Sequence, residues 1–338
     1  MALEHPYFVL AYYTFQPVEN PSIEVKTHKE FLTPLDATSR IYISEEGING
    51  QLSLAKNDAL RYIDWMHSRQ EFKNMEFKVH EWHEQAFPRL VIKYRKYLVG
   101  RDRTVDLSNQ GEHLSPEQWK EMLESEKEAL LLDVRNTYEW DVGHFKGALA
   151  PPCETFREFE KYAEMLKANH DPKQKKVMMY CTGGIRCEVY SALLKDLGFE
   201  KVYQLQGGII KYGLEQGTKH WQGKLFVFDD RLTVPIHPQE DAPVVGKCTH
   251  CKMPSEQYYN CSNTDCNTLF LSCSPCLENH RGCCTDSCIS APRLRPYSQQ
   301  NPHKPFRRKH HYSLPTSSTE SVQASCSLPL PGQPLTPA

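Results

Sequence analysis

The chain has 338 residues, and its 40 Lys and Arg against 42 Asp and Glu leave a formal net charge of −2. This length predicts two or three domains, and the balanced charge excludes a protein that binds nucleic acid through a global basic field. The N-terminal residues lack a secretory signal pattern and no apolar stretch approaches the length of a membrane span, so we expect no membrane association and a cytoplasmic location.

Residues 1–110 combine strand-like and helix-like patterns. Strands are predicted for stretches rich in aromatic and β-branched residues at 7–15, 40–44, 48–54, 76–82 and 89–95. Residues 56–69 have helical spacing, with an expected apolar face of Leu60, Ile63, Trp65 and Met66. The βαββαβ order predicts a ferredoxin-like α+β domain with an antiparallel sheet.

Residues 111–225 predict a second domain, of the α/β class. Ser115 is the expected N-cap of a helix that starts at Pro116. Strands are predicted at 128–135, 175–181 and 201–208, and helices within 155–169 and 187–199, the second ending at the glycine Gly198. Strands that alternate with helices predict a parallel sheet with helices on both faces.

A cysteine follows one of these strands, at the edge of the sheet where α/β proteins bind their ligands. Cys181 begins the loop Thr182, Gly183, Gly184, Ile185, Arg186 and Cys187. The glycines permit a curved backbone whose amides surround the sulfur, while the helix dipole and Arg186 favour a negative charge there. The pattern therefore predicts a Cys181 thiolate of depressed pKa that acts as a catalytic nucleophile.

Only four residues separate Cys181 from Arg186. The phosphate loop of cysteine phosphatases is one residue longer, so the smaller ring here favours a sulfur carried on Cys181 as a persulfide. The alternative is a buried cysteine beside a Gly-Gly turn. Cys187 is either a redox partner of Cys181 or contributes only its amide.

The segments "LLLDVRNTYEWDVGHFKGAL", "CTGGIRCE" and "YQLQGGIIKYG" together resemble a rhodanese domain. The resemblance implies that Asp133, Arg135, His144 and the Gly207-Gly208 pair support the loop structurally. Asp133 has a second possible role, which is to orient Arg186.

The N-terminal segment "YISEEGINGQLS" resembles the signature of rhodanese-type, oxygen-dependent tRNA uridine(34) hydroxylases. That family resemblance implies an oxidoreductase that uses molecular oxygen to convert the wobble uridine of tRNA to 5-hydroxyuridine, with Cys181 as the persulfide-forming catalytic residue and the tRNA anticodon region as partner. The sequence contains no flavin, nicotinamide or iron motif.

Residues 89–103 are rich in basic side chains and contain interleaved tyrosines. The candidate RNA contacts are Arg89, Lys93, Arg95, Lys96, Arg101 and Arg103. The alternative is a solvated strand edge. Residues 291–338 form a basic tail rich in Pro and Ser that we expect to be disordered.

Residues 226–290 contain a dense group of cysteines, which in a long cytosolic chain favours metal binding over disulfides. The predicted ligands of two structural zinc sites are Cys248, Cys251, Cys261, Cys266, Cys273, Cys276, Cys284 and Cys288. Cys283 competes with Cys284 for one position, and His250 and His280 are possible substitutes.

The leading hypothesis is therefore a tRNA uridine hydroxylase. The loop alone also fits a persulfide sulfurtransferase that resembles thiosulfate sulfurtransferase. A third hypothesis is a non-catalytic, zinc-stabilised RNA-binding protein, against which the intact Cys181 and Arg186 count.

Overall fold

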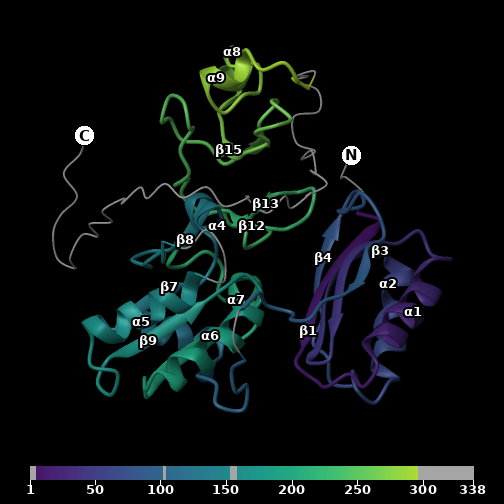
Figure 1. Cartoon of the computed structure of the whole chain (residues 1–338), viewed down its shortest axis with the longest axis vertical. Coiled ribbons are helices and arrows are strands. Elements are labelled where there is room, and N and C mark those ends of the chain that lie inside the picture. Colours follow the sequence, from purple (N-terminus) through teal and green to yellow (C-terminus); the bar gives the residue numbers. More distant parts are fainter. Residues whose placement is uncertain (1–4, 102–103, 153–157, 296–338) are drawn as a thin grey trace, which may run out of the picture. The chain divides into compact units, whose positions relative to one another are not determined.

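The computed structural model describes residues 5–101, 104–152 and 158–295, and these begin with a helix-backed sheet (Figure 1). Its elements are β1 (Tyr7–Thr14), α1 (Pro21–Leu32), β2 (Thr38–Ser44), β3 (Gly47–Ala55), α2 (Lys56–His67), β4 (Lys78–Trp82) and β5 (Ile92–Tyr94). The strand order is β4-β1-β3-β2-β5, antiparallel except that β5 runs parallel to β2. The predicted ferredoxin-like α+β fold is confirmed.

Helices α1 and α2 share an apolar core with one face of this sheet. Alternate strand residues such as Leu10 and Ile41 are fully buried in that core. The expected apolar face of α2 was partly wrong, because Leu60 is 52% exposed whereas Ala59, Tyr62 and Met66 are buried. The other face of the sheet has no helix in this core.

The second sheet is wholly parallel, as predicted. The segment that contains this sheet comprises β6 (Glu112–Leu114), α3 (Pro116–Ser125), β7 (Leu130–Asp133), α4 (Thr137–Val142), β8 (Gly143–Phe145), α5 (Phe159–Asn169), β9 (Lys176–Tyr180), α6 (Ile185–Asp196), β10 (Lys201–Leu205) and α7 (Gly208–Gln216). The sheet order is β6-β10-β9-β7. Ser115 caps α3 in a capping box, with Pro116 at its first position.

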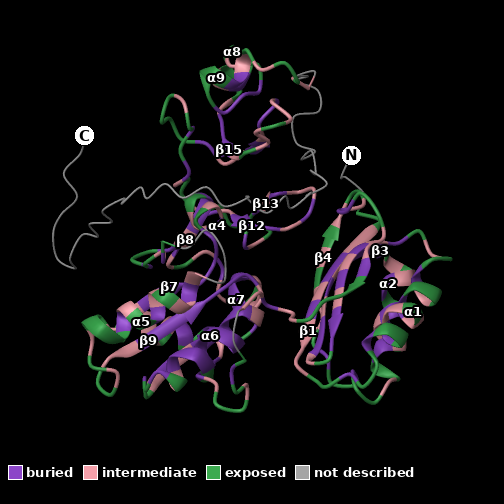
Figure 2. Cartoon of the chain, in the orientation of Figure 1, coloured by how far each residue is buried: buried purple, intermediate pink, exposed green. Residues whose placement is uncertain are grey.

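Helices cover both faces of this parallel sheet. The α5 and α6 side chains pack with Val177 and Met179 of β9 in one apolar cluster, whereas α3 and α7 share the opposite cluster with Met178 and Tyr180. Strand β9 and most of α6 are buried (Figure 2). Cys181, the residue after β9, continues the alternation and lies in the cluster of α5 and α6.

Short elements follow α7. They are β11 (Trp221–Gly223), which pairs with β8, β12 (Leu225–Phe226), β13 (Thr233–Val234), β14 (Tyr258–Asn260), β15 (Leu269–Leu271), α8 (Ser274–Asn279) and α9 (Asp286–Ile289). None of the helices in the described ranges has the length and apolar character that a bilayer crossing requires. Most of the predicted tail, residues 296–338, lies outside the described residues.

A buried ion pair joins the end of β7 to β8. The Arg135 guanidinium donates from Nε and Nη2 to the Asp133 carboxylate at 2.8 and 2.5 Å, and Nη2 also donates to the Gly143 carbonyl at 2.6 Å. Both side chains are fully buried. Each charge therefore depends on the other for its compensation.

Replacing Asp133 with Ala is expected to lower the free energy of unfolding by about 3–5 kcal/mol, because it leaves the Arg135 charge buried without its partner. Chemical denaturation measures the loss. The control is Asp58→Ala, which breaks the more exposed Asp58–Arg61 pair and is expected to cost less than about 1 kcal/mol. Equal losses in the two variants would contradict the structural role of the buried pair.

Candidate functional site

The loop between β9 and α6 surrounds the Cys181 sulfur with hydrogen-bond donors. The Gly184 amide donates to Cys181 Sγ at 3.1 Å, and Gly184 is the N-terminal cap of α6. Cys181 and Cys187 are both fully buried. The predicted position of the sulfur at a helix N-terminus is therefore observed.

The surroundings of Cys181 favour its anionic form. Burial raises the pKa of the thiol, but the hydrogen bond from Cys187, the Arg186 charge and the amides of Arg186 and Gly184 together lower it from 9.0 to about 6. Burial and the adjacent Cys181 sulfur raise the pKa of Cys187 instead. Of the two thiols, Cys181 is the one whose surroundings favour the thiolate.

Arg186 is held beside the sulfur by a carboxylate from another helix. Its Nη1 and Nη2 donate to Glu139 Oε1 and Oε2 at 2.7 and 2.9 Å, and Nη2 also donates to the Thr182 hydroxyl at 3.2 Å. Asp133 pairs with Arg135, so the suggestion that Asp133 orients Arg186 is wrong. Sequence reasoning missed Glu139; its only signal was a carboxylate three residues after the α4 N-cap, Asn136.

Of the two loop glycines, Gly183 and Gly184, only Gly184 occupies a position where a side chain would clash. Gly184 has φ +106°, and a Cβ there would lie 2.6 Å from the Tyr13 hydroxyl, whereas a Cβ on Gly183 would meet nothing within 4 Å. Gly208 has φ +66°, and its Cβ would lie 2.6 Å from the Cys181 carbonyl. The close packing of the loop thus depends on Gly184 and Gly208.

The remaining residues from the rhodanese-like segments support the scaffold. His144 donates from Nδ1 to the Trp140 carbonyl at 2.9 Å and stacks on the Trp140 ring. Burial lowers the pKa of His144. Beyond the loop, the Ile209 amide donates to the Cys181 carbonyl at 3.0 Å, which fastens the start of α7 to the loop.

A cavity of about 230 Å³ opens onto the Cys181 loop. One wall consists of the loop, including Cys181 and Arg186, with Ile210 and Phe228. The opposite wall is formed by the N-terminal sheet, on the face that lacks helices, and its residues include Tyr13, Arg40, Tyr42, Asn49, Gln51 and Lys78. Sequence reasoning missed this wall. Polar residues alternate along β3, which indicates that one face of the sheet lacks an apolar core. This pattern does not show which segment lies against that face.

A hydrogen bond joins the two walls. The Tyr13 hydroxyl of β1 donates to Glu188 Oε1 at 2.9 Å, and the same oxygen lies 3.1 Å from His113 Nε2. Glu188 is buried and follows Cys187 in α6. The sheet face is therefore fastened to the helix that carries the cysteine loop.

The candidate RNA-binding residues lie mostly on the surface. Arg89, Lys93, Arg95 and Lys96 are exposed. The Arg95 guanidinium lies over the ring of Tyr42, a cavity residue, at 5.0 Å. Arg101 is largely shielded from solvent and forms an ion pair with Glu46, and Arg103 lies outside the described residues.

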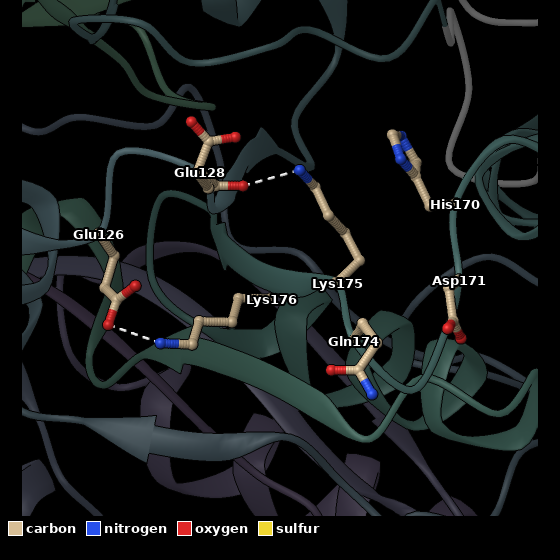
Figure 3. A pocket seen from close by; sticks show the side chains of 7 residues that line it. All are labelled: Glu126, Glu128, His170, Asp171, Gln174, Lys175 and Lys176. Carbon is tan, nitrogen blue, oxygen red and sulfur yellow. Dashed lines mark hydrogen bonds and ion pairs between the residues drawn. The ribbon is translucent and has the colours of Figure 1, made fainter.

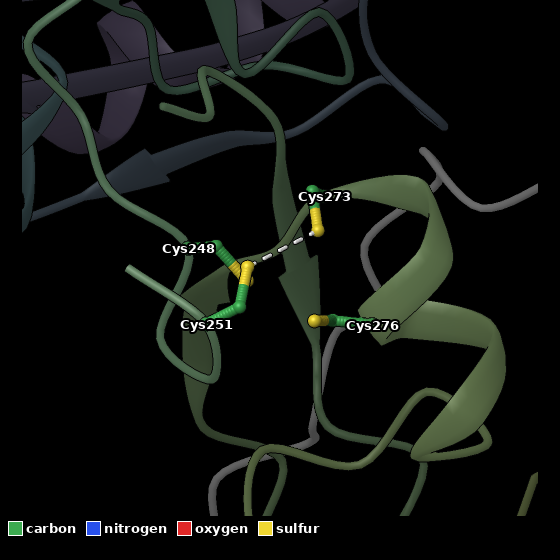
Figure 4. A group of neighbouring side chains, drawn as sticks. All are labelled: Cys248, Cys251, Cys273 and Cys276. Carbon is green, nitrogen blue, oxygen red and sulfur yellow. Dashed lines mark hydrogen bonds between the residues drawn. The ribbon is translucent and has the colours of Figure 1, made fainter. Parts of the chain in front are cut away.

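The cysteine-rich segment brings eight thiols into two clusters. Cys248 and Cys251 meet Cys273 and Cys276, while Cys261 and Cys266 meet Cys284 and Cys288 (Figure 4 shows the first cluster). Within each cluster the sulfur atoms all lie within 4.8 Å of one another, and the pairs Cys251–Cys273 and Cys266–Cys284 are 3.6 Å apart. The ligand pairs are therefore interleaved along the chain, and each cluster is suited to hold a metal ion.

The other candidate ligands lie outside both clusters. Cys283 points its sulfur toward the Arg281 carbonyl, at 3.9 Å. The His250 and His280 rings stack on each other 3.7 Å apart, and His280 Nδ1 bonds Asp286 at 2.9 Å. Of the alternatives considered, the structure selects Cys284 over Cys283 and excludes both histidines from the clusters.

A second hollow, of about 270 Å³, lies near the amino-terminal ends of β7 and β9 (Figure 3). Two of its lysines are engaged: Lys176 pairs with Glu126 at 2.5 Å, and Lys175 donates to the Glu128 carbonyl at 2.7 Å. This hollow is at the opposite end of the strands from Cys181. We assign it no part in the site.

Models of three families match the chain in sequence order. The UPF0176 acylphosphatase-like domain matches residues 7–98, the rhodanese-like domain residues 115–215, and the rhodanase C-terminal family residues 222–289. The first two descriptions agree with the folds observed for those residues.

Relatives are similar to the chain over nearly its whole length. A tRNA uridine(34) hydroxylase of Protochlamydia amoebophila is 59% identical over 312 residues, covering 92% of this chain and 97% of that protein. One of Chlamydia trachomatis serovar D is 52% identical over 309 residues, covering 91% and 94%. Among solved structures, a rhodanese-like domain from Anabaena is 24% identical over 41% of this chain and 94% of its own, with a TM-score of 0.29.

Alkylation of Cys181 is expected to follow a titration with a midpoint at about pH 6, because the thiolate reacts and its pKa is about 6. Mass spectrometry of the Cys181 peptide after timed iodoacetamide treatment gives the rate at each pH. The double variant Glu139→Gln/Arg186→Gln removes the positive charge beside the sulfur without leaving either charge buried alone. Its midpoint is expected to move upward, since loss of a cation disfavours the thiolate.

Lys195→Gln is the matched control, because it removes a positive charge from the last turn of the same helix. Its midpoint is expected to stay at about 6. A midpoint in the unaltered protein near 9, the ordinary value for a cysteine, would contradict the stabilised thiolate.

Proposed function

Because this chain belongs to the tRNA uridine(34) hydroxylase family, we propose that it hydroxylates the wobble uridine of tRNA to 5-hydroxyuridine with Cys181 as the catalytic nucleophile. One observation supports Cys181 above all others. Cys181 combines a lowered pKa with a place among the residues that line a cavity, so a thiol that favours its anionic form lies beside a space suited to a ligand.

The chemistry of uracil suits such a sulfur. The C5=C6 bond is conjugated with the C4 carbonyl, so a soft sulfur anion adds to C6 and places electron density on C5. C5 is the atom that gains the hydroxyl group. Loss of the C5 proton and departure of the sulfur then restore the ring and free the cysteine.

The conversion of C5–H to C5–OH is a two-electron oxidation, and we propose molecular oxygen as the oxidant. One oxygen atom enters the base. The other leaves as water, with two protons and two electrons from an external reductant. The protein's own part in this scheme is to hold the sulfur anion and the base together within the cavity.

The exposed basic residues of the 89–96 stretch are our proposed contacts to the anticodon region. Four of these side chains are exposed: Arg89, Lys93, Arg95 and Lys96. Arg101, in contrast, is held in an ion pair with Glu46. Single-stranded anticodon bases leave the stack readily, and neighbouring phosphates then meet cationic side chains. A cytoplasmic location follows from the proposed tRNA substrate.

In bacteria that lack 5-hydroxyuridine synthesis, the unaltered protein is expected to restore this nucleoside at position 34, and Cys181→Ser is expected to abolish it, because a serine hydroxyl at neutral pH is no comparable nucleophile. Nucleoside mass spectrometry of purified tRNA measures both. Cys283→Ser, a cysteine outside both metal clusters, is the control and should restore the nucleoside. Full activity of Cys181→Ser would contradict Cys181 as the nucleophile, whereas no restoration by the unaltered protein would favour a non-catalytic RNA-binding protein.

The loop geometry also favours a second candidate, a persulfide sulfurtransferase. A short ring of amides with an arginine suits a sulfur carried on Cys181, as its four intervening residues already suggested. Transfer of sulfane sulfur from thiosulfate to cyanide tests this activity directly. Robust thiocyanate formation by a protein that leaves position 34 unmodified would favour the second candidate over the first.

We also propose that both cysteine clusters hold structural zinc. A tetrahedral zinc ion with Zn–S bonds of about 2.3 Å separates its sulfurs by roughly 3.8 Å, close to the observed 3.6 Å contacts. The apolar cluster of this segment is small, with Tyr259, Phe270 and Leu277 as its largest members. Metal binding would therefore supply folding energy that burial does not.

Native mass spectrometry is expected to find two zinc ions per chain, and Cys284→Ser should lose one of them because it removes a ligand from the second cluster. Cys283→Ser, at the adjacent residue, should keep both. A zinc-free protein that resists proteolysis in the 248–288 segment would contradict the proposal.

A further inference from the structure

The sheet wall of the cavity consists of two neighbouring cross-strand rows. In one row, Asn49 of β3 lies between Tyr42 of β2 and Tyr13 of β1. In the next row, Gln51 lies beside Ala11 of β1. Since residues two apart on a strand share a face, Asn49 and Gln51 lie side by side toward the Cys181 loop.

A small residue creates the hollow in this wall. Ala11 separates two long polar side chains, Gln51 on β3 and Lys78 on β4. Its short side chain leaves room that any larger residue would fill. The cavity of about 230 Å³ is smaller than the roughly 300–1,000 Å³ of pockets that take drug-sized ligands. It is therefore suited to a single small ring.

The amides in this wall are available to a ligand. Within the described part of the chain, neither the Asn49 nor the Gln51 side chain has a hydrogen-bond partner. Each amide offers donors and an acceptor. Polar groups that are half-buried in a cavity and have no partner in the protein are typical of a site that recognises a polar ligand.

Uracil has the complementary pattern on one edge. Its O4, N3–H and O2 atoms present acceptor, donor and acceptor, and N3 lies across the ring from C6. An amide pairs with O4 and N3–H through two hydrogen bonds. Because a thiolate adds to C6 from above the ring plane, a base with one face over Cys181 leaves its O4 and N3–H edge to the amides that line the same cavity.

Aromatic side chains line the same space. Tyr42 from the sheet and Phe228 from the opposite wall both contribute to the cavity. Enzymes that act on an extruded base commonly hold it between aromatic or apolar groups while they read its Watson–Crick edge. The Arg95 guanidinium over Tyr42 further links this cavity to the exposed basic stretch.

From these observations we infer that the helix-free face of the N-terminal sheet recognises the wobble uracil, with Asn49 and Gln51 as the residues that pair with its O4 and N3–H edge. This inference rests on the proposed function and assigns the base-reading part of that same site. An amide with no partner in the protein can turn over, so each amide can pair either with O4 and N3–H of uracil or with the amino group and N3 of cytosine.

The test compares two anticodon stem-loop RNAs that differ only in U34 or C34. The full chain carrying Cys181→Ser binds them without turnover, and competition binding gives the ratio of affinities. We expect the parent to bind both RNAs, because its amides can pair with either base. Asn49→Asp and Gln51→Glu keep the shape but replace a donor with an acceptor that repels O4 and accepts from the cytosine amino group, so each should shift the ratio toward C34 by about tenfold.

Asn57→Asp is the matched control, because Asn57 is an exposed amide on α2 of the same domain. Its ratio should equal that of the parent. Ala11→Leu, which fills the hollow, should weaken the binding of both RNAs while the melting temperature stays near that of the parent. Asp and Glu variants with the parent's ratio of affinities would overturn the inference.

A separate measurement distinguishes this inference from the proposed function. Formation of 5-hydroxyuridine by the protein with Cys181 intact tests the function alone. If the protein with Cys181 hydroxylates tRNA but both acidic variants keep the parent's ratio of U34 to C34 affinity, only the base-reading role is contradicted. If it does not hydroxylate tRNA but the ratio of affinities shifts, only the proposed reaction is contradicted and recognition of the base remains supported.

Discussion

The buried pair of Arg186 and Glu139 is the interaction on which the site depends. A guanidinium in this position lowers the pKa of Cys181, yet a lone cation in a buried loop would carry a large desolvation cost. Glu139 offsets that cost from the far side of the arginine and, through Thr182, also holds the loop in shape. The loop can therefore keep an anionic sulfur and its counter-charge inside the protein.

Each of the two sheets contributes a different part of the site. The parallel sheet ends at Cys181 and supplies a helix N-terminus, which any rhodanese-like loop can use to stabilise a sulfur anion. The N-terminal sheet faces this loop with polar side chains instead of a helix, and Tyr13 fastens it to Glu188. The cavity beside the Cys181 loop therefore has a polar wall on its opposite side.

The "EEGING" segment serves this arrangement in two ways. Glu46 accepts a hydrogen bond from the Leu98 amide at 2.7 Å and pairs with Arg101, which fixes a segment that also lines the cavity. Asn49, three residues later, enters the cavity wall itself. The same short motif therefore shapes the turn, anchors residues 98–101 and places an amide opposite Cys181.

Local patterns in the sequence determined the βαββαβ order, the parallel sheet, the Ser115 cap and the position of Cys181 after a buried strand, because periodicity, capping and glycine placement are properties of neighbouring residues. Other features depended on contacts between distant segments. Tertiary packing alone decided that Arg186 pairs with Glu139 rather than Asp133 and which face of α2 is buried. It also decided how the cysteine pairs interleave and that amides lie opposite Cys181. The physical reason is that a strand's alternation shows which residues share a face, whereas the packing of whole elements decides what that face meets.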